Sequence, residues 1–299
     1  MNVLSMLYII IRNPNKQILL KNIFSKYFRK SGKFICPNGY ELPFNEHNKD
    51  YVYEIYLFSL YHGVEFSDKP GYWKFKNGII ETPNGIKFDV KYFSSLIFAE
   101  TFLYDIHFCD PDLEGKVVVT AGAYVGDTPL YFASRGAKVY AFEPDSELYE
   151  VALHNLSLNP ELAKNIVLKN YAIGNDGEVD FPINRAKGSS SVYDISRYKT
   201  VKVRSVSVST ILKEFNISEP YLLDLDIKGK EFDVINDDAI SKFKIVRIEY
   251  NINIGGTMIG TRDELIDKLK EYGFRKIRVY KPNELVYDLH YIGIIEARK

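Results

Sequence analysis

The chain has few of the features that mark a disulfide-stabilised, metal-binding or nucleic-acid-binding protein. Its 299 residues contain two cysteines, Cys36 and Cys109, which are too few for a disulfide framework and favour a reducing, cytoplasmic setting. The five histidines show no close pairing of the kind that ligates zinc, so we expect no metal site. Basic and acidic residues number 39 each, so no overall field draws the chain to nucleic acid.

Long apolar runs are also lacking. The run at residues 3–11 is far shorter than the about 20 residues that a membrane span requires, and it lacks the flanks of a signal peptide. Residues 16–33 place apolar and basic side chains at helical spacing. Two interpretations stay open for this segment: a helix packed on the main domain with a solvated basic face, or peripheral contact of residues 1–33 with an anionic membrane.

Two regions, residues 1–93 and 94–299, differ in pattern. The first combines helical segments with short β-prone runs around two Asn-Gly pairs at 77–78 and 84–85, which is typical of an antiparallel meander. In the second, strand-like and helical runs alternate from residue 116, which predicts a parallel sheet with helices on both faces. We therefore expect an α/β, Rossmann-like, mostly parallel sheet closed by a C-terminal antiparallel hairpin and preceded by a smaller α+β region.

The turn after the predicted strand Val117–Ala121 limits the choice of cofactor. A dinucleotide fingerprint aligned on Gly122 would need glycines where Tyr124 and Asp127 stand, and the lysine of a P-loop is missing. A carboxylate at the third position would repel a pyrophosphate. These features disfavour a phosphate-rich cofactor and, with it, an NAD-linked dehydrogenase.

A cofactor without phosphates suits the turn better. Gly122 and Gly126 allow close approach of the amino-acid end of S-adenosylmethionine, and Glu143 stands where the second strand ends. A carboxylate can accept bonds from both ribose hydroxyls of that molecule. The pattern favours methyl transfer.

The same residues resemble the FkbM family of S-adenosylmethionine-dependent methyltransferases. The segment "VTAGAYVGDT" is similar to the family's D-V-G-A-x-x-G-D-T motif, and the acidic "EP" follows the second strand. Further matches come in order: "NYAIGNDGEVDF" at 170–181, "KGSSSV" at 187–192, "LLDLDIKGKEFDVI" at 222–235 and "IVRIEYN" at 245–251. The resemblance covers residues 95–298 and implies a class I, Rossmann-like methyltransferase domain.

The resemblance also implies roles for individual residues. The residues that would line the methionine part of the cofactor are Gly122, Ala123, Gly126, Asp127 and Thr128, with Tyr124 as a lid over the turn. Glu143 would hold the ribose, and Asn170 and Ala172 would lie near the adenine edge. Asp226 and Glu249 are the candidate catalytic acids that would remove a proton from the acceptor.

Two positions depart from the family pattern. Thr120 stands where the family has an acid that helps to seat the cofactor's ammonium group, and it keeps an oxygen acceptor without the charge. Lys228 puts a cation where the family has a carboxylate. Three outcomes are open for Lys228: it points away, it pairs with Glu231 or Asp224, or the chemistry is altered or lost.

The leading hypothesis is an S-adenosylmethionine-dependent methyltransferase that methylates a hydroxyl of a sugar, lipid or secondary metabolite. The alternative is a catalytically degenerate binding or scaffold protein that kept the fold, with Thr120 and Lys228 as its evidence. Residues 1–93 would shape the acceptor pocket or dock the enzyme at a membrane. The sequence leaves the acceptor and the oligomeric state open.

Overall fold

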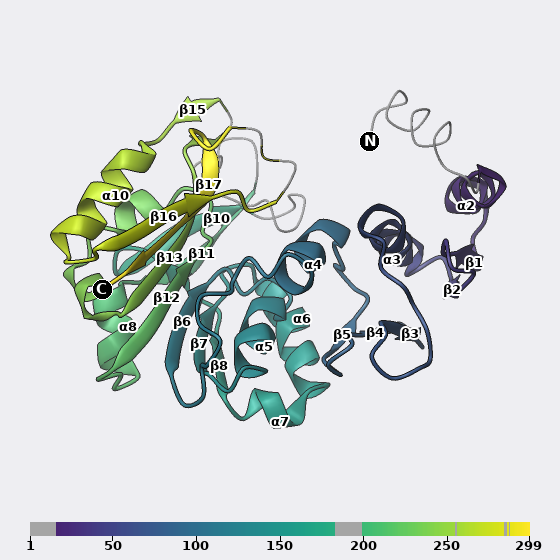
Figure 1. Ribbon diagram of the computed structural model, residues 1–299, viewed down its shortest axis with the longest axis horizontal. Helices are drawn as coiled ribbons and strands as arrows, with labels where there is room; N and C mark the ends of the chain where they lie inside the picture. The colour runs from purple at the N-terminus through teal and green to yellow at the C-terminus, as the bar shows by residue number, and fades with distance from the viewer. Residues whose placement is uncertain (1–15, 183–198, 255, 284–285, 287) are drawn as a thin grey trace. The chain divides into compact units, whose positions relative to one another are not determined.

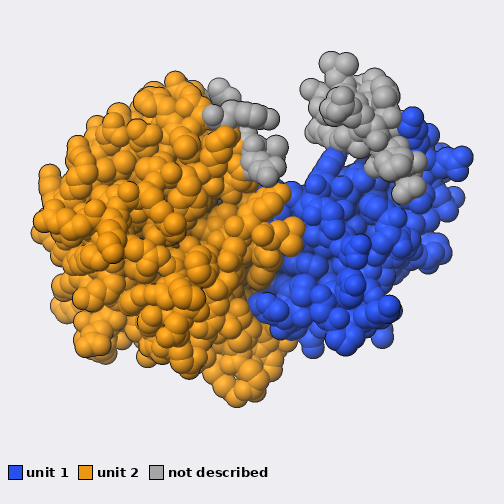
Figure 2. Space-filling view, in the orientation of Figure 1, with its two compact units in different colours: residues 1–99 blue, residues 100–299 orange. Residues whose placement is uncertain are grey.

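The computed structural model describes residues 16–182, 199–254, 256–283, 286 and 288–299. The apolar run at 3–11 and the serine-rich segment at 187–192 lie outside the described residues. The chain divides into two compact units, Met1–Ala99 and Glu100–Lys299 (Figure 2). Each unit is described by itself below.

The first unit combines helices with short antiparallel strands. Its elements are α2 (Lys16–Phe28), β1 (Gly32–Ile35), β2 (Glu41–Phe44), α3 (Lys49–His62), β3 (Lys74–Lys76), β4 (Ile79–Glu81), β5 (Lys87–Asp89) and the start of α4 (Ser95–Phe102). The meander predicted from the Asn-Gly pairs is confirmed, because β3, β4 and β5 form an antiparallel sheet in that order. Asn77 and Gly78 both adopt the positive φ that such a tight turn requires.

A seven-stranded sheet organises the second unit (Figure 1). Its strands are β6 (Val117–Ala121), β7 (Lys138–Phe142), β8 (Ile166–Lys169), β12 (Pro220–Leu225), β13 (Ile245–Asn251), β16 (Lys276–Tyr280) and β17 (Ile292–Arg298). The order is β16-β17-β13-β12-β6-β7-β8, with only β17 antiparallel to its neighbours. The predicted mostly parallel sheet with a C-terminal hairpin is confirmed. Strand order reverses between β6 and β12, the position where open α/β sheets bind ligands.

Helices cover both faces of this sheet (Figure 1). They are α5 (Asp127–Ala133), α6 (Ser146–Ser157), α7 (Pro160–Ala163), α8 (Val208–Glu214), α9 (Glu231–Val234), α10 (Arg262–Glu271) and the 3-10 helix η1 (Asp238–Lys242). Short strands complete the unit: β9 (Ala172–Ile173), β10 (Gly177–Pro182) and β11 (Thr200–Val206) form one small sheet, and β14 (Asn253–Ile254) pairs with β15 (Thr257–Met258). On one face, alternate sheet residues such as Val119, Leu223 and Val246 pack with α8 and α10 in one apolar core.

The sequence suggests two helix starts, a cap at Ser146 or Asp145 and a hydroxyl cap at Thr128 before Pro129. The first prediction is confirmed and the second is wrong. Asp145 caps α6, since its carboxylate accepts bonds from the backbone amides of Glu147 and Leu148. The predicted hydroxyl cap at Thr128 is wrong, because α5 already begins at Asp127 with Gly126 as its N-cap. Gly126 has φ 89°, so the chain turns into the helix two residues earlier than the Thr-Pro pair suggested.

The other face of the sheet buries a line of polar side chains at matched register positions. Thr120 on β6, Asp224 on β12 and Arg247 on β13 are paired across adjacent strands. Arg247 Nη1 donates to Asp224 Oδ1 at 2.7 Å, and Thr120 Oγ1 donates to Asp224 Oδ2 at 3.0 Å. His107 Nδ1 lies 3.3 Å from the same Oδ2, and Arg247 Nε donates to the Ile106 carbonyl at 2.8 Å. These bonds fix residues 106–107 on the sheet.

We predict that Asp224→Asn destabilises the fold by about 3–5 kcal/mol, because it leaves a fully buried guanidinium without its main counter-charge. Burial alone would raise the pKa of Asp224, but Arg247 and His107 outweigh it and hold that pKa below its usual range. The contribution is therefore present above the unfolded pKa of about 3.9 and is lost as the pH falls further. Urea unfolding measures both effects. Asp267→Asn, which breaks an exposed pair with Lys270, serves as the control and should change stability by less than about 1 kcal/mol.

Candidate functional site

The turn after β6 lies in close contact with the segment after β12. Gly122 has φ 90°, and a Cβ atom there would lie 2.4 Å from the backbone oxygen of Asp226. The Asp226 amide in turn donates to the Ala121 carbonyl at 3.2 Å. Only glycine fits this position, both by conformation and by space. The contact brings Asp226 to the point where strand order reverses.

Glu143 holds the turn in shape from the end of β7. Its Oε2 accepts from the Tyr124 amide at 2.8 Å, and its Oε1 accepts from the Asp145 amide at 2.9 Å. Tyr124 adopts φ 48°, a strained value for a residue with a side chain. Burial raises the pKa of Glu143 to about 8, against the lowering effect of the two amides. Each carboxylate oxygen has a second lone pair, so these bonds leave acceptor capacity.

Asn170 ties the next turn to the same place. Its Nδ2 donates to the carbonyls of Glu143 at 2.8 Å and Pro144 at 3.1 Å. Ala172 follows in β9, which pairs with β11 in the small sheet. The turns after β6, β7 and β8 are therefore joined by hydrogen bonds through Glu143 and Asn170. Thr120 lies beneath this edge, fully buried, with its hydroxyl bonded to Asp224.

The start of α5 carries a buried acid with an unsatisfied oxygen. Asp127 Oδ2 accepts from Thr101 Oγ1 at 2.9 Å, whereas Oδ1 has no hydrogen-bond partner within the described part of the chain. Burial raises the pKa of Asp127 to about 6, and Thr101 and His107 oppose that rise. Thr128 Oγ1 lies 3.3 Å from His107 Nε2. An unsatisfied buried carboxylate oxygen favours a cationic or hydrogen-bond-donating partner.

The two candidate catalytic acids both face Lys228. Lys228 Nζ lies 2.8 Å from Asp226 Oδ1 and 3.5 Å from Glu249 Oε1. Of the outcomes left open for Lys228, an ion pair is found, but its partners are Asp226 and Glu249 and not Glu231 or Asp224. Burial disfavours the charge of Lys228, but the two carboxylates outweigh it and raise the pKa of the amine. Glu249 Oε2 also lies 3.5 Å from Arg247 Nη2. Asp226 and Glu249 are therefore both held in ion pairs.

Glu231, an acid of the segment "LLDLDIKGKEFDVI", makes only structural contacts with the residues that the structure describes. Its Oε1 accepts from the Ile227 amide at 3.1 Å, and its fully buried Oε2 has no hydrogen-bond partner among the residues described. Burial raises the pKa of Glu231 to about 8. The side chain braces the loop that carries Lys228.

Glu100 is a third acid of the cluster, and the sequence analysis missed it. Burial, followed by repulsion from Glu249, raises the pKa of Glu100 to about 7, while Asn283 and Lys228 lower it. Its Oε1 accepts a hydrogen bond from Asn283 Nδ2. Glu100 therefore differs from Asp226 and Glu249, because its hydrogen-bond donor is a neutral amide. The only signal in the sequence was an acid that follows a run of apolar residues in "SSLIFAETFLYDIHF".

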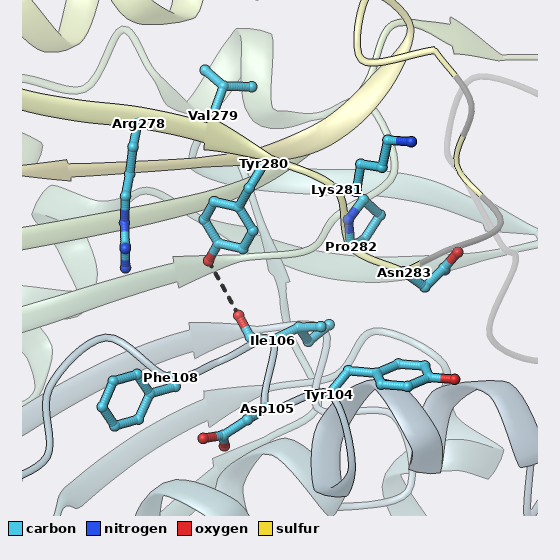
Figure 3. A pocket seen from close by; sticks show the side chains of 10 residues that line it. All are labelled: Tyr104, Asp105, Ile106, Phe108, Arg278, Val279, Tyr280, Lys281, Pro282 and Asn283. Atoms are coloured by element: carbon cyan, nitrogen blue, oxygen red, sulfur yellow. Dashed lines mark hydrogen bonds between the residues drawn. The ribbon is translucent and has the colours of Figure 1, made fainter. Parts of the chain in front are cut away.

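A cavity of about 540 Å³ opens beside Asn283. Figure 3 shows it between two walls, residues 278–283 on one side and residues 104–106 with Phe108 on the other. Tyr280 Oη bridges the walls by donating to the Ile106 carbonyl at 3.4 Å. The exposed rings of Tyr104 and Phe108 line it. Because Asn283 both lines the cavity and bonds Glu100, the cavity adjoins the acidic cluster.

The strand order, the glycine turn at the reversal point and the acid after the second strand define a Rossmann-like methyltransferase fold. The model of the methyltransferase FkbM domain matches residues 121–276, more than half of the 299 residues. The chain belongs to this family. Family membership supports S-adenosylmethionine-dependent methylation as its general activity. No curated protein matches the chain.

Several solved methyltransferase structures are similar to the chain at low identity. The METTL16 methyltransferase domain is 11% identical over 96% of this chain and 95% of its own, with a TM-score of 0.44. Magnesium protoporphyrin IX methyltransferase from Synechocystis PCC 6803 is 13% identical over 69% of this chain and 78% of its own, with a TM-score of 0.38. Precorrin-6y C5,15-methyltransferase from Geobacter metallireducens is 12% identical over 62% of this chain and 82% of its own, with a TM-score of 0.35.

We predict that Glu231→Gln makes stability less dependent on pH. The folded pKa of Glu231, about 8, exceeds its unfolded value, so the folded state keeps a proton that the unfolded state has lost. The free energy of unfolding should therefore fall as the pH rises from about 5 to about 8, and the amide should reduce that slope by up to about 1.4 kcal/mol per pH unit. Urea unfolding at several pH values measures the slope. An unchanged slope in the variant, equal to that of the exposed control Glu271→Gln, would contradict the burial effect.

Proposed function

We propose that the chain is an S-adenosylmethionine-dependent O-methyltransferase whose acceptor is a hydroxyl of a sugar, lipid or secondary metabolite. The main support for this choice of donor is that four backbone amides of the turn after β6 already have hydrogen-bond acceptors. The amides of Gly122 and Ala123 donate to the Phe142 carbonyl at 3.0 and 3.1 Å, and that of Tyr124 donates to Glu143. The Gly126 amide donates to the Ala123 carbonyl at 2.7 Å.

A phosphate-bearing cofactor needs such amides free, because they form the cradle for its oxygens. Residues 120–127 contain no lysine or arginine that could replace them. The turn instead presents carboxylates, from Glu143 and Asp127. This set of groups fits a cation with hydroxyl donors, and S-adenosylmethionine is such a molecule. The residues present therefore fit the group.

The proposed roles follow from the contacts. Glu143 accepts hydrogen bonds from the ribose hydroxyls through its remaining lone pairs, and Asp127 Oδ1 accepts from the ammonium end. Asn170, whose amide hydrogens are used on the Glu143 and Pro144 carbonyls, shapes the adenine side rather than reading it. When bound, S-adenosylmethionine supplies an electrophilic methyl group on a positively charged sulfur.

Glu100 is the residue we assign to accept the proton of the acceptor hydroxyl. Asp226 and Glu249 are each ion-paired with Lys228, so both carboxylates are already engaged by a cation. The pKa of Glu100, near 7, suits proton transfer at neutral pH. Thr101, the next residue, bonds Asp127 at the start of α5, so the end of α4 is tied to the donor turn. Asn283 orients the carboxylate and links it to the cavity, which we assign to the acceptor.

The second candidate function is a catalytically degenerate binding protein, and the ion pairs of Lys228 favour it. A cation between Asp226 and Glu249 neutralises both residues that the family resemblance marked as catalytic. The double change Thr120→Asp and Lys228→Glu restores the family pattern. If donor binding is absent in the native chain and rises about a hundredfold, by about 2.8 kcal/mol, in this variant, degeneration is the better account.

We predict that the native chain binds S-adenosylmethionine and that Glu143→Gln weakens this binding about 10- to 100-fold, because two charge-assisted bonds to the ribose lose their charge. Isothermal titration calorimetry measures both dissociation constants. Glu150→Gln, an exposed change on α6, is the matched control and should leave the affinity unchanged. Equal affinities of the native chain and Glu143→Gln would rule out the ribose role.

For Glu100→Gln we predict a fall in kcat of about 10²- to 10⁴-fold with little change in KM, because the amide keeps an oxygen for Asn283 but cannot accept a proton. Transfer of labelled methyl from S-adenosylmethionine to a panel of sugars, lipids and small hydroxylated metabolites identifies the acceptor and supplies the assay. Asn283→Ala should move the acidic limb of the native rate profile, which lies near pH 7, to higher pH, because Asn283 lowers the pKa of Glu100. Full activity of Glu100→Gln would exclude Glu100 as the base.

A further inference from the structure

Helix α2 of the first unit exposes its apolar side chains and buries polar ones. Leu20, Phe24, Tyr27 and Phe28 are 52%, 52%, 66% and 74% exposed. Their spacing of four, three and one residues forms a single stripe along the helix. Asn22 and Ser25 are buried on the opposite side, next to Leu19.

The inward face is fixed by specific bonds, so the orientation of α2 within its unit is well determined. Asn22 Nδ2 donates to the Ile35 carbonyl at 2.8 Å, and the Ile35 amide donates back to Asn22 Oδ1 at 3.0 Å. Lys26, on the neighbouring side of the helix, pairs with Asp50 on α3 and lies over the ring of Tyr53. Rotating the helix to bury its apolar stripe would break these contacts. The stripe is therefore an outward surface of this unit.

Basic side chains border the stripe. Residues 16–33 contain no aspartate or glutamate and include Lys16, Lys21, Arg29 and Lys30, all exposed. Within the described residues, no carboxylate lies within ion-pair distance of Lys16, Lys21 or Arg29, whereas Lys30 pairs with Glu46 at 3.5 Å. The Arg29 guanidinium lies 5.9 Å from the ring centre of Phe24, and the rings of Phe24 and Phe28 stack at 5.0 Å. Aromatic and basic groups alternate across one surface.

The apolar stripe and its basic border together indicate what kind of partner binds α2. A helix with an exposed apolar stripe edged by cations is the pattern of an interfacial helix that lies on anionic lipid. A second copy of the chain fits less well, because a two-fold contact would bring Lys21 and Arg29 of both copies together. No helix in the described ranges is long and apolar enough to cross a membrane, and α2 has 13 residues. The helix can therefore lie on a bilayer but cannot span it.

We propose that α2 docks the protein on an anionic membrane surface, with Leu20, Phe24 and Phe28 among the headgroups and Lys21 and Arg29 against lipid phosphates. The proposal is independent of the methyl donor and of the catalytic assignments. Retention at a membrane would hold the enzyme close to acceptors that are themselves in the bilayer.

Co-sedimentation of the full chain with vesicles tests the proposal. We expect binding to vesicles of phosphatidylcholine with phosphatidylserine, at least tenfold weaker binding to phosphatidylcholine alone (~1.4 kcal/mol), and release by high salt. Lys21→Gln with Arg29→Gln should weaken binding by about fivefold per charge. Phe24→Asp with Phe28→Asp should abolish it. Both positions are exposed, so circular dichroism and thermal unfolding should stay unchanged.

Tyr72→Asp is the matched control, an exposed aromatic of the same unit outside the stripe, and it should bind like the native chain. Three results would overturn the proposal: no binding of the full chain to anionic vesicles, equal binding to neutral vesicles, or retained binding in the Phe24 and Phe28 variant. Sedimentation equilibrium distinguishes a self-interface. A dimer that the Phe24 and Phe28 changes dissociate, without vesicle binding, would assign the stripe to a second copy of the chain.

Discussion

The buried ion pair between Asp224 and Arg247 is the interaction on which the rest of the second unit depends. It crosses from β12 to β13 at matched register, and its remaining bonds reach Thr120 on β6 and the Ile106 carbonyl. Because unpaired charges in a protein interior are strongly unfavourable, all these partners must stay in place together. Through Ile106 the pair also fixes the segment that forms one wall of the cavity. The ion pair that joins β12 to β13 therefore also fixes the position of one cavity wall.

The pattern of alternating strands and helices was sufficient to predict the parallel sheet and its closing hairpin, because period and turn residues are local signals. The turn around Gly122 was predictable for the same reason. The roles of Thr120 and Lys228 were not predictable, since each depends on residues brought close by the fold. These are Asp224 for Thr120, and Asp226 with Glu249 for Lys228.

Asp224 and Arg247 are visible in the sequence as charged residues inside apolar strand runs, "LLDLD" and "IVRIEYN". Such charges need partners, but only the register identifies them. Glu100 was not predicted, because the fold alone brings it close to Asn283 and Glu249.

The acids at the carboxyl edge share one physical property. Glu143, Asp127 and Glu100 are all buried enough for their pKa values to rise, to about 8, 6 and 7. Carboxyl groups with raised pKa values favour ligands that stabilise the ionised form. A nearby cation does so and lowers the pKa again. Lys228 supplies that charge at Asp226 and Glu249. We infer that S-adenosylmethionine favours the ionised form of two others, because its ribose hydroxyls donate to Glu143 and its ammonium group pairs with Asp127.

Proton release on donor binding tests this account most directly. Calorimetric titration of the native chain with S-adenosylmethionine at pH 7, in buffers of different ionisation enthalpy, measures how many protons leave the complex. Because the pKa of Glu143 is about 8 in the free protein, hydrogen bonds from the ribose hydroxyls to the ionised carboxylate should expel between about half a proton and one proton per molecule bound. Absence of binding, or binding with proton uptake or with no proton exchange, would contradict the claim that these buried carboxyls hold a positively charged methyl donor.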